Sequence, residues 1–157
     1  MTTDSIRVRA AREGDTDAIV SIVNEAYLVE AFFVAGDRTH VAEVRDLIRE
    51  GQCYVAEDNG RVVGCIEVAT KDGRGYFGML AVSPAIQGRG LGRRLITFAE
   101  DTARAAGCAV MDIKVVSVRG DLVRFYESLG YRITGTEPYV HRPVLQPVHF
   151  VLMVKDV

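Results

Sequence analysis

Three glycines at alternate positions, set among arginines, make residues 83–96 (SPAIQGRGLGRRLI) the stretch of this chain best suited to hold an anion. The residues concerned are Gly88, Gly90 and Gly92, with Arg89, Arg93 and Arg94. Glycine lets the backbone approach phosphate oxygens closely and allows positive φ. An apolar run precedes the stretch and an amphipathic run follows it, which places it at the start of a helix, where free N–H groups bind anions. The pattern predicts a diphosphate site at a strand–loop–helix junction.

The glycine spacing differs from that of two common nucleotide-binding loops. A Walker A loop needs GxxxxGK followed by Ser or Thr, and no Lys–Ser/Thr pair follows here. A dinucleotide fingerprint needs GxGxxG near the first strand of a parallel unit, whereas these glycines read GxGxG in the middle of the chain. The diphosphate therefore belongs to another class of ligand.

The cysteines and histidines do not form a predicted site. Cys53, Cys65 and Cys108 are far apart, and each lies among apolar neighbours, which is typical of buried, reduced thiols. The histidines have no metal-ligand spacing, so no metal site is predicted.

Length, charge and hydropathy favour one soluble domain over residues 1–157. The formal net charge of −2 gives no general attraction for nucleic acid. No apolar run approaches the roughly 20 residues that span a bilayer, and the polar N-terminus does not resemble a signal peptide. We therefore expect a cytoplasmic protein that contacts neither nucleic acid nor membrane.

Hydrophobic periodicity predicts a mixed α/β layer fold that positions the glycine loop between a buried strand and a helix. The expected strands are 6–9, 53–57, 61–70, 76–83, 110–116, 131–137 and 149–157. The expected helices are 15–27, 39–50, 90–106 and 121–129. A DNG turn joins the second and third strands, and Asp15 or Thr16 is expected to cap the first helix. The apolar last strand could be central or could lie at an edge.

Two motifs resemble those of the GNAT acetyltransferase superfamily. MLAVSPAIQGRGLGRRLI is similar to its acetyl-CoA-binding segment, Q/R-x-x-G-x-G/A, with Gln87, Gly90 and Gly92 at the motif positions. Downstream, VRFYESLGYRITG resembles its second motif, a helix that carries a tyrosine. The resemblance implies an α/β fold with a GNAT-type mixed, mostly antiparallel twisted sheet of about seven strands, about four helices and splayed central strands. It also implies acetyl-CoA as co-substrate.

By this resemblance, the strand at 76–82 carries a bulge and parts from the strand at 110–116 to admit the pantetheine arm of acetyl-CoA. Leu80 and Val82 are expected to supply most of the main-chain hydrogen bonds, and the Leu80 N–H would stabilise the oxyanion of the tetrahedral intermediate. The residues expected at the cofactor are Leu80, Ala81, Val82, Gln87, Gly88, Arg89, Gly90, Leu91, Gly92, Arg93, Arg119, Phe125 and Tyr126. Arg119 stands where many relatives carry an asparagine, so that amide contact is not carried over.

The resemblance assigns Tyr126 as the general acid that protonates the leaving thiolate, since a phenol can donate to sulfur. The base is open. Glu67 lies among apolar neighbours that would raise its pKa, and Tyr76 stands where some relatives carry a glutamate. Glu30, His141 or no dedicated base are the other candidates.

The acceptor is expected between the segments 27–38 and 138–150, both rich in aromatic or apolar residues. Tyr27, Glu30, Phe33, Glu67 and Tyr76 are the candidate substrate-binding residues, with Asp37 as a further ammonium partner. We expect an acetyl-CoA-dependent N-acetyltransferase that acts on a small primary amine through a ternary complex. The alternatives are a non-catalytic acyl-CoA sensor and an acetyltransferase for protein N-termini or lysines. The family also suggests a homodimer.

Overall fold

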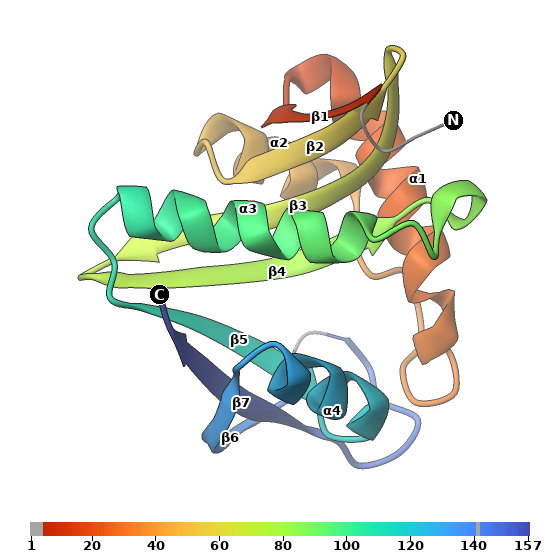
Figure 1. The fold of residues 1–157 in the computed structure, drawn as a ribbon. Coiled ribbons are helices and arrows are strands. Elements are labelled where there is room, and N and C mark those ends of the chain that lie inside the picture. The colour runs from red at the N-terminus through yellow and green to blue at the C-terminus, as the bar shows by residue number, and fades with distance from the viewer. Residues whose placement is uncertain (1–4, 141) are drawn as a thin grey trace.

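The computed structural model describes residues 5–140 and 142–157. Its strands are β1 (Ile6–Ala10), β2 (Cys53–Asp58), β3 (Arg61–Lys71), β4 (Arg74–Val82), β5 (Val110–Val116), β6 (Arg132–Pro138) and β7 (His149–Asp156). Its α-helices are α1 (Thr16–Ala26), α2 (Val41–Arg49), α3 (Leu91–Ala105) and α4 (Gly120–Ser128) (Figure 1). Short 3-10 helices are η2 (Glu13–Asp15), η3 (Tyr27–Glu30) and η4 (Pro84–Ile86). Within the described residues, the predicted element order is confirmed.

All seven strands belong to one sheet, in the order β1-β2-β3-β4-β5-β7-β6. Every neighbouring pair is antiparallel except β4 and β5, which run parallel. The last strand, β7, pairs with β5 on one side and β6 on the other. It is therefore internal, and β1 and β6 form the edges of the sheet.

The sheet opens between its two parallel strands. β4 and β5 pair only from Arg74–Tyr76 to Val110–Asp112, and beyond these residues they diverge (Figure 1). A bulge in β4 lies at the opening, where Met79 has a φ of 47° and the register against β3 shifts. The bulge and the splayed central strands expected from the resemblance are both present.

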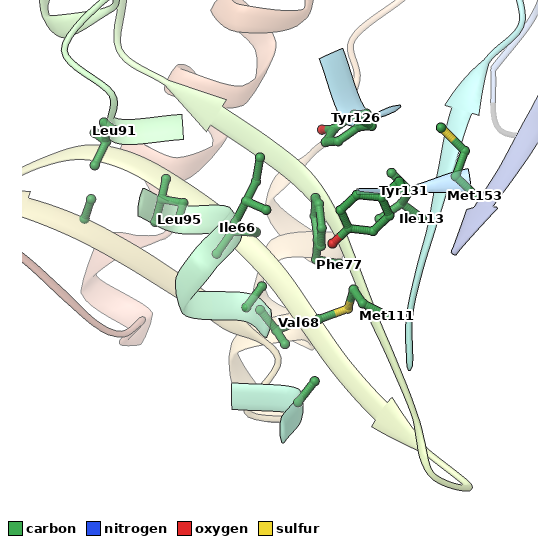
Figure 2. Packing of buried hydrophobic residues seen from close by; sticks show 14 of the residues in the cluster. Ile66, Val68, Phe77, Leu91, Leu95, Met111, Ile113, Tyr126, Tyr131 and Met153 are labelled. Atoms are coloured by element: carbon green, nitrogen blue, oxygen red, sulfur yellow. The ribbon is translucent and has the colours of Figure 1, made fainter. Parts of the chain in front are cut away.

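The bulge also changes which face of the sheet each side chain of β4 occupies. Phe77 packs in the cluster beneath α3 and α4, where Figure 2 shows it beside Tyr126 and Tyr131. In a regular strand Met79 and Ala81 would share the face of Phe77. Instead they pack with α1 and α2 on the opposite face, because the extra residue of the bulge reverses the alternation.

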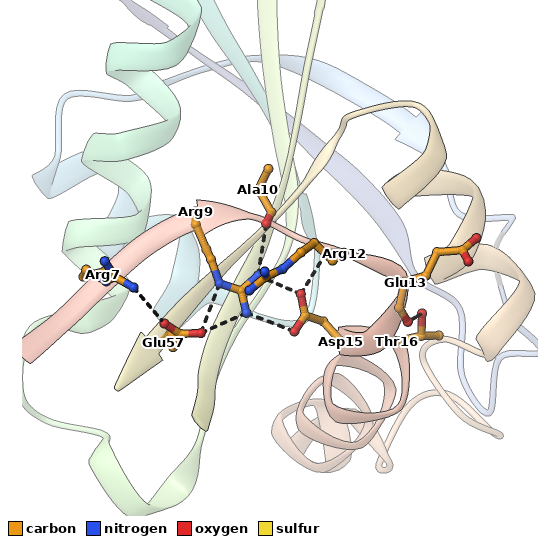
Figure 3. Close-up of polar contacts among 8 residues, drawn as sticks. All are labelled: Arg7, Arg9, Ala10, Arg12, Glu13, Asp15, Thr16 and Glu57. Atoms are coloured by element: carbon orange, nitrogen blue, oxygen red, sulfur yellow. Dashed lines mark hydrogen bonds and ion pairs between the residues drawn. The ribbon is translucent and has the colours of Figure 1, made fainter. Parts of the chain in front are cut away.

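The first strand is fixed by an arginine with two carboxylate partners (Figure 3). Arg9 of β1 donates to Asp15 at 2.8 Å and to Glu57 of β2 at 3.0 Å. The hydrogen bond from Arg9 holds the pKa of Asp15 below its usual value. Asp15 occupies the N-cap position of α1, but its side chain bonds Arg9 and the Arg12 N–H rather than the helix. The expected Asp15 cap is therefore an ion pair that anchors the start of α1 to the sheet.

Cys53, Cys65 and Cys108 are free and buried, as predicted. Among residues 5–140 and 142–157, no helix is both long and apolar enough to cross a membrane.

Candidate active site

The glycine loop joins the end of β4 to the start of α3. Gly90 is the N-cap of α3 with a φ of 76°, and Gly88 has a φ of 85°. Both lie in the left-handed region, where a side chain is strained. The Gln87 side chain donates from Nε2 to the Val82 carbonyl at 3.3 Å, which holds the loop against the strand. The result is an exposed helix N-terminus beside the open edge of β4.

A cavity of about 420 Å³ runs from this loop to the opening between the central strands. Twelve of the residues predicted at the cofactor line it: Leu80, Ala81, Val82, Gln87, Gly88, Gly90, Leu91, Gly92, Arg93, Arg119, Phe125 and Tyr126. Arg89 is not among its lining residues. We call it the loop cavity.

Of the three loop arginines, Arg93 is the one that lines the loop cavity. Its guanidinium lies 5.4 Å from the centre of the Phe125 ring. Arg94 turns away and donates to the Ile6 carbonyl of β1 at 2.6 Å. Arg93 and the backbone N–H groups of the loop are therefore the positively polarised groups on the cavity wall at this end.

A second cavity of about 340 Å³ lies on the other side of the opening, and we call it the acceptor cavity. Three of the candidate substrate-binding residues, Tyr27, Glu30 and Tyr76, line it. Further lining residues include Arg38, Lys114, Tyr139 and Phe150. The segments 27–38 and 138–150 therefore both contribute to its wall.

The two cavities meet at the bulge. Five residues line both: Tyr27, Glu30, Leu80, Leu122 and Tyr126. A ligand in the loop cavity and a ligand in the acceptor cavity would therefore face each other beside the Leu80 backbone and the Tyr126 side chain. Such an arrangement suits direct group transfer between two bound molecules.

Tyr126 of α4 is held rigidly, and its hydroxyl is left available. Its ring packs against Tyr131 and Phe77, with centroid distances of 5.8 and 6.0 Å (Figure 2). The Phe125 ring lies 5.3 Å from it, centroid to centroid. The hydroxyl makes no hydrogen bond to any residue in 5–140 or 142–157, although it lines both cavities. Burial raises the pKa of Tyr126, so the phenol keeps its proton at neutral pH.

Glu30 is already engaged by two arginines. Its carboxylate accepts from Arg142 at 2.6 Å and lies 3.9 Å from Arg119. Arg119 also donates to Asp121 at 3.1 Å. Burial raises the pKa of Glu30, although Arg142 opposes the shift. Glu30 therefore joins the loop before β7 to η3, and one of its two carboxylate oxygens is occupied by Arg142.

Tyr76 and Glu67 lie on the same side of the sheet. The Tyr76 ring extends along β4, and a Cβ at Gly78 would lie only 2.5 Å from its hydroxyl. Glu67 of β3 pairs with Gly78 and does not line the acceptor cavity. Burial is the main cause of the raised pKa of Tyr76, and the charge of Glu67 raises that pKa further. Burial raises the pKa of Glu67 as well, and Arg38 opposes this shift.

The remaining predicted residues lie elsewhere or outside the described chain. Phe33 is fully buried in a separate cluster with Val34, Val116 and Phe150, so its role is packing. Asp37 is exposed and lines neither of the two cavities. His141, a candidate base, lies outside the described residues.

Sequence reasoning missed Arg38, which lines the acceptor cavity, and Arg142, which is bonded to Glu30 in its wall. Arg142 pairs with Glu30, 112 positions away, and no local pattern predicts that contact. Arg38 follows Gly36 and Asp37, which is typical of a solvated turn. The only available signal was its position within the predicted acceptor segment.

Comparisons with known proteins agree with this geometry. The sequence model described as "Acetyltransferase (GNAT) family" matches residues 17–131. The L-methionine sulfoximine/L-methionine sulfone acetyltransferase of Salmonella typhimurium is 33% identical over 146 residues, covering 85% of this chain and 84% of its own. The L-amino acid N-acyltransferase MnaT of Escherichia coli is 32% identical over 146 residues, covering 85% and 83%.

A solved structure shares the fold. The putative acetyltransferase from Salmonella typhimurium, determined with its cofactor acetyl-CoA, superposes with a TM-score of 0.75 at 27% identity. The superposition covers 97% of this chain and 94% of that chain.

Proposed function

Because the chain belongs to the acetyltransferase (GNAT) family, we propose that it transfers an acetyl group directly from acetyl-CoA to the primary amine of a small molecule. The observation that carries the proposal is the meeting of the two cavities at Leu80 and Tyr126. A ternary complex fits this geometry without a covalent acyl-enzyme, because the three cysteines are buried outside both cavities.

The loop cavity suits acetyl-CoA in its chemistry. The N-terminus of α3, with Gly88 and Gly90 left-handed and Arg93 beside them, would hold the diphosphate. The open edge of β4 offers unpaired backbone groups to the amides of the pantetheine arm. Both features lie along one continuous wall of the cavity.

Acetyl-CoA supplies the thioester: the amine nitrogen attacks its carbonyl carbon, the carbon–sulfur bond breaks, and coenzyme A leaves as a thiol. The protein would provide a hydrogen-bond donor and a proton. We assign the donor to the Leu80 N–H beside the Met79 bulge, facing the thioester oxygen. We assign the proton to the Tyr126 hydroxyl, which would give it to the departing sulfur.

The acceptor must also lose a proton, since an ammonium nitrogen has no free electron pair. We propose Glu67 as the final proton acceptor, reached through water and the Tyr76 hydroxyl. Its raised pKa supports this role, because a base works best when its pKa lies near the working pH. The effect of Glu67 on the pKa of Tyr76 supports their proximity.

A small acceptor fits better than a protein chain. The acceptor cavity measures about 340 Å³, and Tyr139 and Phe150 form part of its wall. The relatives named above also support a small molecule, since their names specify amino acids and amino-acid analogues. Three buried free cysteines support a reducing compartment, and we propose the cytoplasm. The homodimer stays a prediction, which size-exclusion chromatography with light scattering would test.

The test is thiol release from acetyl-CoA with a panel of amines: amino acids, polyamines, arylalkyl amines, aminoglycosides and N-terminal peptides. We expect turnover with small amines and a rise in melting temperature when acetyl-CoA binds. A melting temperature unchanged by acetyl-CoA would refute the assignment of the loop cavity. Binding without turnover across the whole panel would instead favour the sensor function.

A further inference from the structure

One guanidinium that lines the acceptor cavity, that of Arg38, donates no hydrogen bond within residues 5–140 and 142–157. Arg38 lies between η3 and α2, and its side chain lines the cavity. The backbone beside it is fixed, because Asn24 accepts from the Thr39 N–H at 2.9 Å and donates to the Thr39 carbonyl at 3.1 Å. The Arg38 guanidinium also lies 5.3 Å from the centre of the Tyr27 ring. Arg38 is therefore positioned at both its backbone and its side chain.

The hydrogen-bonding capacity of Arg38 is unused. Its side chain is only 23% exposed, and its nearest carboxylate oxygen, on Glu43, is 3.8 Å away. That oxygen already accepts a hydrogen bond from the Thr39 hydroxyl. Across residues 5–140 and 142–157, the guanidinium donates no hydrogen bond, although arginine carries five N–H donors. A largely buried cation in this state favours an anion from outside the chain.

The other charged residues of the acceptor cavity are matched within the protein. Glu30 is bonded to Arg142 at 2.6 Å, and Lys114 pairs with Glu137 at 2.7 Å. Glu67 lies near enough to Arg38 for each to affect the other's environment, but the two form no ion pair. The cavity therefore presents one cation whose hydrogen-bond donors have no partner.

We infer that Arg38 binds the carboxylate of the acceptor, so that the acceptor is an amino acid rather than a simple amine or a polyamine. The inference rests on the proposed function. A guanidinium matches a carboxylate through two parallel hydrogen bonds, which fixes orientation as well as position. With the carboxylate held at Arg38, the amine of the same molecule is left to reach the junction at Leu80 and Tyr126. A polycationic acceptor would instead place positive charge against Arg38.

The first experiment compares amines that differ only in the carboxylate. Steady-state kinetics would be measured for methionine against 3-(methylthio)propylamine, and for phenylalanine against phenethylamine, with the methyl esters as a third member of each set. For the amino acid of the two that reacts faster, we expect kcat/KM to be about 100-fold higher than for the amine and ester that lack its carboxylate, because those compounds leave the Arg38 hydrogen-bond donors unsatisfied. Equal or greater efficiency with the carboxylate-free amines would overturn the inference.

The second experiment assigns the discrimination to Arg38. Arg38→Met should raise KM for the amino acid about 100-fold and remove the preference over the decarboxylated amine, while KM for acetyl-CoA stays unchanged. Arg38→Lys keeps the charge and should restore part of the preference. Arg45→Met is the matched control, because Arg45 is exposed on the neighbouring helix α2 and lines neither cavity. A preference that persists in Arg38→Met would overturn the inference.

Binding measurements separate this inference from the proposed function. Calorimetric titration of the amino acid into the enzyme–coenzyme A complex should give heat that Arg38→Met abolishes. If acetyl-CoA binds but no amino acid binds or reacts, the inference about Arg38 is wrong. If acetyl-CoA itself does not raise the melting temperature, the proposed function is wrong.

Discussion

Two neighbouring tyrosines should respond to loss of the hydroxyl in opposite ways. The Tyr126 hydroxyl has no hydrogen-bond partner within the described residues and faces both cavities. The Tyr131 hydroxyl donates to buried Glu100 at 2.7 Å. The two rings are in contact, with centroids 5.8 Å apart, so their packing environments are shared. Tyr126→Phe and Tyr131→Phe therefore each remove a phenolic hydroxyl, which is without a hydrogen-bond partner in the first case and hydrogen-bonded in the second.

The expected magnitudes follow from these settings. Tyr126→Phe keeps the ring packing and breaks no hydrogen bond, so the free energy of unfolding should change by less than about 0.5 kcal/mol. Loss of a general acid should lower kcat by about 10²- to 10⁴-fold, equivalent to about 2.7 to 5.4 kcal/mol of barrier. Tyr131→Phe removes a buried hydrogen bond to a charged group, which should cost about 2 kcal/mol of stability and leave kcat within about twofold.

The assay is release of coenzyme A followed with a thiol reagent, alongside urea unfolding of each variant. The protein's own thiols should not interfere, because all three cysteines are buried and burial raises the pKa of Cys53 to about 12. If Tyr126→Phe retained full kcat, or lost activity only in proportion to its stability, the assignment of Tyr126 as the acid would be refuted.

Three further substitutions test the close packing at Gly75, the assignment of Glu67 as the base, and the ion pair between Arg142 and Glu30. Gly75→Ala should lower the free energy of unfolding in urea by about 1–3 kcal/mol, because the new Cβ would lie 2.7 Å from the Ala103 Cβ. Glu67→Gln should lower kcat and remove the acidic limb of the kcat/KM profile, which in the wild type rises as pH increases through the raised pKa of Glu67. Arg142→Met should lower the free energy of unfolding at pH 8 by about 3 kcal/mol, since it removes the hydrogen-bonded cation from buried Glu30 and leaves the more distant Arg119 and Arg38. Because burial raises the pKa of Glu30, that defect should shrink in unfolding experiments as pH falls toward 5 and the carboxyl takes up a proton.

The first two substitutions have a control variant in the same chain, and the third has an outcome that would contradict it. Gly14→Ala introduces a Cβ with nothing within 4 Å and should leave stability nearly unchanged. Tyr76→Phe should lower kcat but keep the acidic limb, which distinguishes a relay from the base itself. A pH-independent defect in Arg142→Met would show that Glu30 is not the group left unpaired.

The order of elements and the glycine loop could be predicted because each depends on local sequence. The alternation of the hairpin strands, the DNG turn and the glycines that end helices are short-range signals. The loop motif also predicted most of the residues that line the loop cavity. These features can be predicted without knowing which other parts of the chain pack against them.

The residue pattern of β4 by itself does not predict the bulge, which is expected only through the family resemblance, and it does not predict the contacts inside the acceptor cavity. The strand YFGMLAVS is apolar at both alternating sets of positions, so nothing in it shows that the faces reverse after Phe77. Met79 adopts a φ of 47°, a conformation that a sequence reader would reserve for glycine or asparagine. The partners of Glu30 and the unmatched donors of Arg38 depend on segments more than a few residues apart, and only the folded chain brings them together.

The opening of the sheet also bears on aggregation through strand edges. An exposed strand edge is normally a template on which a second chain can pair and begin to aggregate. Here the unpaired edges of β4 and β5 face each other within the molecule, each supported on its outer side by β3 or β7. A whole strand from another chain would need to enter between two strands that are still paired at Arg74–Tyr76. The backbone donors and acceptors of β4 and β5 in the opening are thus accessible to a narrow, flexible ligand but not to a strand of another polypeptide chain.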